Sequence, residues 1–86
     1  MKGRFITAKV IAEFKEHLIL EERSEITIEK YIRDVKAFTA YTQNTVVTKE
    51  TVISYKKHLQ ETYAVRSVNS MLASINSLFM FLYYFW

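Results

Sequence analysis

The stretch Ser24–Phe38 has the apolar spacing of an amphipathic helix, and it constrains the fold of this chain more than any other segment. Its apolar residues recur at intervals of three and four, which places them on one side of an α-helix. These residues, continued by one threonine, are Ile28, Tyr31, Ile32, Val35, Phe38 and Thr39. The opposite side is charged and carries Glu29, Lys30, Arg33, Asp34 and Lys36. The stretch therefore predicts a helix with one face in a core.

The near absence of glycine and proline favours the same structure throughout the chain. There is one glycine, Gly3, and no proline among the 86 residues. Turns that need a positive φ are then expected to be few, and the Asn-Gly signal of a tight hairpin is absent. Helices joined by short polar loops suit this composition, so the fold class is expected to be all-α.

Four helices are expected, at about 8–22, 24–41, 48–61 and 67–84. Each is preceded by, or begins at, a hydroxyl residue that can act as N-cap: Thr7, Ser24, Thr48 and Ser67. Half of the residues are apolar, which fits one small domain over residues 1–86 with modest stability.

The last predicted helix has no charged residue from Ser67 to the end of the chain. Its apolar face consists of Val68, Met71, Leu72, Ile75, Leu78, Phe79 and Leu82. Its other face consists of Asn69, Ser70, Ala73, Ser74, Asn76 and Ser77. A membrane-spanning helix is one interpretation of so long an uncharged segment. Because the serines and asparagines gather on one face, an amphipathic helix of a bundle is favoured.

The final residues, Leu78–Trp86, are almost uninterruptedly apolar. Met80, Phe81 and Tyr84 are expected to point away from the apolar face of their helix, where they would form an exposed aromatic patch. Such patches usually mark an interface. Two interpretations follow: the first helix covers the patch, or the chain is the N-terminal part of a longer protein. The second is preferred here.

Composition and charge exclude several kinds of site. The chain has no cysteine, which excludes disulfides and thiolate metal sites, and its two histidines, His17 and His58, lie far apart in the sequence. No pair of carboxylates, Ser/His arrangement or glycine-rich phosphate loop has catalytic spacing. No cofactor, no metal and no catalytic residue are therefore expected in this chain. The net charge of +3 permits nucleic-acid binding without indicating it. No signal peptide is visible, so a cytoplasmic protein is expected.

Three motifs along the chain have the spacing of one known kind of domain. The first consists of Thr27, Tyr31, Asp34, Val35 and Phe38, which read Thr-x-x-x-Tyr-x-x-Asp-Val-x-x-Phe. It resembles the Thr-x-x-x-Tyr-x-x-Asp-Leu-x-x-Phe signature of the N-terminal SAM-like, or core-binding, domain of tyrosine recombinases, the phage and transposon integrases. The segment Thr48–Leu59 resembles the third helix of that domain. The segment Ser67–Leu82 resembles its fourth helix, which usually opens with threonine, an aliphatic residue and asparagine. The similarity covers about residues 8–82.

The resemblance implies a four-helix, SAM-like orthogonal bundle that grips one side of a DNA duplex and positions it. A C-terminal catalytic domain, which this chain lacks, would hold the other side and carry the arginines, lysine, histidines and tyrosine nucleophile. Tyr31, Tyr41, Tyr55 and Tyr63 are thus not expected to be the nucleophile, and Tyr31 and Tyr55 are expected in the core. The implied partners are double-stranded DNA, that catalytic domain and other recombinase protomers. The implied setting is a bacterial or phage-encoded protein associated with the nucleoid.

The resemblance also implies that the second and fourth helices face the major groove. The candidate DNA-binding residues are Thr27, Lys30, Arg33, Arg66, Ser67, Asn69 and Ser70. Lys30 and Arg33 suit a phosphate or a guanine edge, and Asn69 suits an adenine. The family often has a basic residue directly after this asparagine, where the chain has Ser70 and Met71. Strong phosphate contact from the fourth helix is therefore not expected.

Alternatives remain open at both helices. On the second helix, Glu29–Arg33 and Lys30–Asp34 have the i,i+4 spacing of ion pairs on a solvated face. On the fourth, the small polar face suits packing against a neighbouring helix. For the whole chain, one alternative is a helical bundle that binds a protein partner through Leu78–Trp86 and has no DNA role. Another is a membrane-associated helix at Ser67–Trp86.

Overall fold

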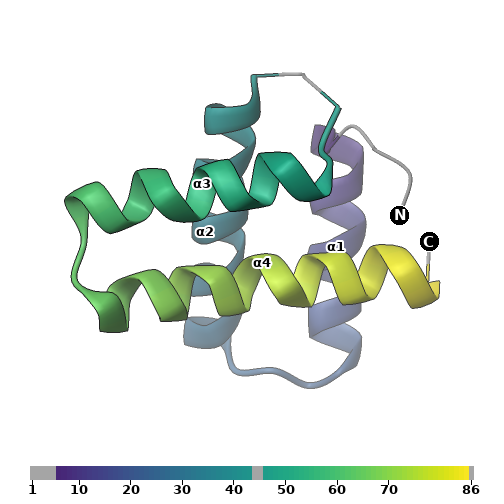
Figure 1. The fold of residues 1–86 in the computed structure, drawn as a ribbon. Coiled ribbons are helices and arrows are strands. Elements are labelled where there is room, and N and C mark those ends of the chain that lie inside the picture. The colour runs from purple at the N-terminus through teal and green to yellow at the C-terminus, as the bar shows by residue number, and fades with distance from the viewer. Residues whose placement is uncertain (1–5, 44–45, 86) are drawn as a thin grey trace.

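Four helices form the fold, in a computed structural model that describes residues 6–43 and 46–85, the last two by their backbone alone. They are α1 (Ala8–Leu20), α2 (Glu25–Thr42), α3 (Lys49–Thr62) and α4 (Val65–Phe85). In Figure 1, α3 and α4 lie side by side and cross in front of α1 and α2, which also lie side by side. The predicted all-α orthogonal bundle is confirmed.

Three of the four predicted N-caps are confirmed by hydrogen bonds at helix starts. The Thr7 hydroxyl accepts a hydrogen bond from the Val10 amide at 3.2 Å, and the Ser24 hydroxyl accepts one from the Thr27 amide at 3.2 Å. Thr48 and Thr51 form a reciprocal capping box, in which each side chain accepts from the backbone amide of the other. Such caps satisfy amides that have no partner inside the helix, which is why these loops can be short.

The fourth predicted cap is wrong, because α4 begins earlier than Ser67. The helix starts at Val65, and the Val68 amide donates to the Ala64 carbonyl at 3.0 Å. Ala64 takes the place of the cap although its methyl group cannot accept a hydrogen bond. Ser67 lies in the first turn of α4 instead, exposed to solvent.

The end of α1 also differs from the prediction, which extended this helix to residue 22. The helix ends at Leu20, and Glu22 has a left-handed backbone with φ of 58°. The amides of Glu22 and Arg23 donate to the carbonyls of Ile19 and Leu18, at 2.9 and 3.2 Å. This is the Schellman pattern, which closes a helix by turning its last amides back onto its own carbonyls.

The core lies where the apolar faces of the four helices meet. Both predicted apolar faces, of α2 and of α4, point into it, and Val35, Phe38 and Leu78 have no exposed surface. Phe38 contacts Tyr55 of α3 and Phe79 of α4 edge-on, with ring centroids 4.9 and 6.0 Å apart. Tyr55 is 3% exposed, so its predicted place in the core is confirmed, and Tyr31 is half-buried against the same cluster.

One prediction about the C-terminal residues is corrected. Phe81 is buried, because α1 covers it: its ring lies 5.6 Å from that of Phe14 and 5.0 Å from that of His17. Met80 does point away from the core and is 56% exposed, as is Tyr83 at 72%. The side chain of Tyr84 lies outside the described residues. The interpretation in which the first helix covers the aromatic patch therefore holds for Phe81, while two large side chains stay on the surface.

None of the described helices is both long enough and apolar enough to cross a bilayer.

Candidate nucleic-acid interface

A groove runs between α2 and the N-terminal half of α4, and it brings together most of the predicted site residues. Its volume is about 540 Å³. The lining residues are Lys30, Arg33, Asp34, Ala37, Tyr63, Arg66, Ser67, Ser70 and Met71. Five of these were predicted as DNA-binding residues from the sequence: Lys30, Arg33, Arg66, Ser67 and Ser70.

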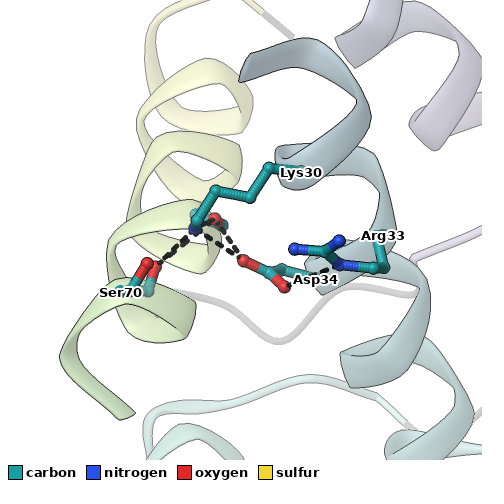
Figure 2. A network of polar contacts seen from close by, with 5 residues as sticks. Lys30, Arg33, Asp34 and Ser70 are labelled. Atoms are coloured by element: carbon teal, nitrogen blue, oxygen red, sulfur yellow. Dashed lines mark hydrogen bonds and ion pairs between the residues drawn. The ribbon is translucent and has the colours of Figure 1, made fainter. Parts of the chain in front are cut away.

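Lys30 reaches from α2 across to α4, where its ammonium group is fully engaged (Figure 2). Its Nζ atom donates to Asp34 Oδ2 at 2.8 Å, to the Ser74 hydroxyl at 2.9 Å and to the Ser70 carbonyl at 3.0 Å. An ammonium group has three N–H donors, and all three are used by these contacts. A phosphate would have to displace one of them to bind Lys30.

Asp34 is buried, and this overturns the interpretation of its pair with Lys30 as one on a solvated face. The Lys30–Asp34 pair forms as the i,i+4 spacing predicts, but the Asp34 side chain is only 6% exposed. Its Oδ2 atom also accepts a hydrogen bond from Ser74, at 2.7 Å. The physical reason is that α4 covers this side of α2, so the carboxylate meets a serine and a lysine in place of water. The other expected pair, Glu29–Arg33, is not among the ion pairs of the described residues.

Ser74 is the residue that the sequence interpretation missed. It is fully buried and completes what we call the polar latch: Lys30, Asp34 and Ser74 with the Ser70 carbonyl. A signal existed in the sequence, since Ser70 and Ser74 are one turn apart in a segment without charged residues, and Lys30 and Asp34 are one turn apart on a charged helix face. Nothing in the sequence alone, however, indicates that these two pairs face each other.

Two arginines border the groove with their guanidinium groups in solvent. The side chain of Arg33 is 76% exposed, and its Nε atom lies 3.9 Å from Asp34 Oδ1. Arg66 is exposed in the first turn of α4. A guanidinium group carries five N–H donors in a planar fork that fits a phosphate. Because Lys30 already balances the charge of Asp34, the two arginines give this groove a net positive charge.

The other two predicted residues lie apart from the groove. Thr27 belongs to the start of α2, where its hydroxyl accepts a hydrogen bond from the Ser24 hydroxyl at 2.8 Å. Asn69 is exposed on the outer side of α4. As contacts to DNA, all seven residues stay predictions.

The pKa of Tyr55, in the core, is affected by the charge of Asp34 in the polar latch. Burial raises the pKa of Tyr55 above its ordinary value of 10.0, and the negative charge of Asp34 raises it further, followed by a contribution from Tyr63. A buried tyrosine with a raised pKa keeps its proton and is a poor nucleophile. This agrees with its place in the core.

Comparison with known proteins gives one family. The model of the phage integrase N-terminal SAM-like domain matches residues 11–84, which run from α1 to the last turn of α4. Neither the curated proteins nor the solved structures gave a match. The family match covers all four helices and confirms the resemblance that the three motifs carry. The chain therefore belongs to the phage integrase N-terminal SAM-like domain family.

Proposed function

We propose that this chain is the DNA-binding N-terminal part of a tyrosine recombinase and grips one side of a duplex for a catalytic domain on the other side. Membership of the family supports a recombinase role. In such a protein, cutting and rejoining through a phosphotyrosyl intermediate would belong to the catalytic domain. This chain would supply grip and position, and it would act beside other recombinase protomers.

The observation that carries the proposal is the pair of exposed arginines on the groove between α2 and α4. Arg33 stands on one wall and Arg66 on the other, so one strand of a duplex lying over the groove can meet both. The nearest carboxylate, Asp34, is turned inward and bound by Lys30 and Ser74. It therefore repels a phosphate less than an exposed carboxylate would. Ser67 and Ser70 lie on the same wall as Arg66 and suit hydrogen bonds to phosphate oxygens.

The structure changes the choice of variants for testing this proposal. Lys30→Ala would disturb the polar latch, so a loss of DNA binding in that variant could come from a disturbed fold. Arg33→Ala/Arg66→Ala removes two exposed cations and leaves the latch intact. Lys56→Ala/Lys57→Ala is the matched control, since it removes the same charge from an exposed part of α3.

Fluorescence anisotropy of a labelled duplex, titrated at several salt concentrations, measures the effect. The wild-type chain should bind weakly, with a dissociation constant near the non-specific range of roughly 10⁻⁴–10⁻⁶ M. The arginine variant should bind more weakly, and the slope of log affinity against log salt should become shallower by about 2. The lysine control should change far less. If the arginine variant shows the same salt-dependent binding as the wild-type chain, the DNA-binding site lies elsewhere on the chain. If a folded wild-type chain does not bind DNA, the proposal is overturned.

A second candidate function is protein binding at the C-terminal end of α4. Met80 and Tyr83 are exposed beside a hollow of about 430 Å³ that Asn76 and Phe79 also line. Exposed apolar side chains of this size favour a protein partner. Sedimentation velocity tests the simplest form of this idea: self-association of the wild-type chain that Met80→Glu abolishes would support it, with Ile53→Glu on α3 as control.

A further inference from the structure

The outer side of α4 carries an exposed row of residues, of which only Arg66 also lines the groove. Arg66, Asn69, Ala73 and Asn76 are all exposed and follow one another at intervals of three and four. This spacing places them on one face of the helix, turned away from the buried Val68, Ile75 and Leu78. We call these four residues the outer row.

The residue types of the outer row suit contact with the major groove of DNA. From Arg66 to the end of α4 there is no acidic residue, so nothing on this helix repels phosphates. Arg66 stands at one end of the row as an anchor for the backbone, and the uncharged amides that follow it suit base edges. Ala73, between the two asparagines, is small enough to let the helix approach the bases closely, and its methyl group suits contact with a thymine methyl.

The two asparagines are free to bind. Neither the Asn69 nor the Asn76 side chain takes part in a hydrogen bond to another described residue, and both residues are exposed. An asparagine amide pairs with adenine through two hydrogen bonds, to N6 and N7. Since the residues are seven positions apart, they lie two turns, or about 10.5 Å, from each other along the helix axis. For a helix whose axis runs along the DNA, with about 3.4 Å between successive nucleotides of a strand, this distance corresponds to about three base pairs.

We infer that Asn76 is a specificity-determining residue, which reads an adenine about three base pairs from an adenine read by Asn69. The inference rests on the proposed function and adds a sequence preference to it. Arg33 and Arg66 set the affinity through phosphates, and the two asparagines select the bases.

Selection from a library of randomised duplexes at low salt, followed by sequencing of the bound fraction, tests this assignment. The wild-type chain should enrich two adenines about three base pairs apart. Asn76→Ala should lower the preference for adenine at one of these positions by roughly 5- to 100-fold and leave the other position unchanged. Asn69→Ala should do the reverse. Gln60→Ala removes an exposed amide from α3 and is the matched control, expected to leave both preferences intact.

The salt dependence of binding separates the two ways in which the experiment can fail. Asn76→Ala should keep the wild-type salt slope, because it removes no charge. Salt-dependent binding in which Asn76→Ala retains every wild-type preference would overturn the role of Asn76 and leave the proposed function standing. If the folded wild-type chain binds no duplex at low salt, both fail together.

Discussion

The two ends of α4 are held to the rest of the bundle by different kinds of contact. In its N-terminal half, α4 meets α2 through the polar latch, in which Lys30, Asp34 and Ser74 satisfy one another. Figure 2 labels Lys30 and Asp34 of this latch. Near its C-terminus, α4 meets α1 through rings, with Phe81 packed on Phe14 and His17. Burial of rings stabilises in proportion to area and tolerates small rotations, whereas hydrogen bonds require fixed directions.

This difference indicates a division of roles along one helix. A buried ion pair gains little net stability, because removing its charges from water offsets much of the attraction between them. The polar latch is therefore expected to contribute less to the free energy of unfolding than the contact between α1 and the C-terminal end of α4, which we call the aromatic end. What the latch supplies is orientation, because it fixes the rotation of α4 about its own axis and the position of α4 along that axis relative to α2. Those two parameters fix where Arg66 stands relative to Arg33.

Phe14→Ala should have the largest effect on stability, because it removes a buried ring from the aromatic end, the contact between α1 and the C-terminal end of α4. Phe14 is 1% exposed and contacts the ring of Phe81. Loss of a buried phenyl group costs roughly 3–5 kcal/mol, a large part of the stability of a small domain. Urea denaturation followed by circular dichroism measures it. Met80→Ala, an exposed change on the same end of α4, should stay within about 0.5 kcal/mol. Equal losses in the two variants would contradict the assignment of a packed aromatic end.

Lys30→Met should come second. It leaves the buried Asp34 carboxylate without its main counter-charge, and breaking a fully buried pair costs about 3–5 kcal/mol. Because the Lys30 side chain is 32% exposed, we expect a smaller loss, of about 2–3 kcal/mol.

The double variant Lys30→Met/Asp34→Leu makes the comparison of the two ends sharper. If the polar latch serves orientation more than stability, replacing both charges with apolar groups should restore much of the loss in Lys30→Met. The same urea titration gives the coupling energy. A double variant that is less stable than either single variant would contradict a latch that serves orientation more than stability.

Ser74→Ala and Ser70→Ala form a matched pair within the polar latch and should differ. The Ser74 hydroxyl donates to Asp34 and accepts from Lys30, so its loss should cost about 1–2 kcal/mol. Ser70 contributes its backbone carbonyl to Lys30, which alanine retains, so Ser70→Ala should change stability by less than about 0.5 kcal/mol. Thermal denaturation of both variants measures the difference. A Ser70→Ala loss as large as that of Ser74→Ala would mean that the hydrogen bonds are assigned to the wrong atoms.

The sequence predicts the individual helices and their buried faces better than it predicts the contacts between the helices. The spacing of Ile28, Val35 and Phe38 determines a helix and its buried face, because that periodicity belongs to one segment alone. Asp34 is different: its i,i+4 spacing from Lys30 is the same whether the pair faces water or a second helix. Only the position of α4 decides between the two, and that position depends on contacts between residues about forty positions apart.

The same limit explains the error at Phe81, whereas the error at Ser67 is local to the start of α4. Phe81 lies beside the apolar face of its own helix, and only the placement of α1 shows that this side is covered. Ser67 has the side chain of a good cap, whereas the chain begins the helix at Val65 after an alanine that cannot cap. The sequence therefore predicts most of the polar residues that line the groove, but not the packing of α2 against α4 that forms it. The latch that holds the walls together was visible only once the helices were placed.

The smallest expected effect is a pH dependence that links the polar latch to the core. Burial and then the charge of Asp34 raise the pKa of Tyr55 in the folded chain above its ordinary value of 10.0. In the unfolded chain Tyr55 loses its proton near pH 10, while in the folded chain it keeps the proton to higher pH. Above pH 10 the unfolded state therefore binds fewer protons, so stability is full below pH 10 and falls as pH rises through the folded pKa. Urea denaturation between pH 8 and pH 11 should show this fall, and Tyr55→Phe should make it shallower.

Asp34→Asn should shift the absorbance titration of Tyr55 to lower pH, because it removes the charge that opposes ionisation. A Tyr55 titration unchanged by Asp34→Asn would mean that the latch and the core are electrostatically separate, and that burial alone sets the pKa.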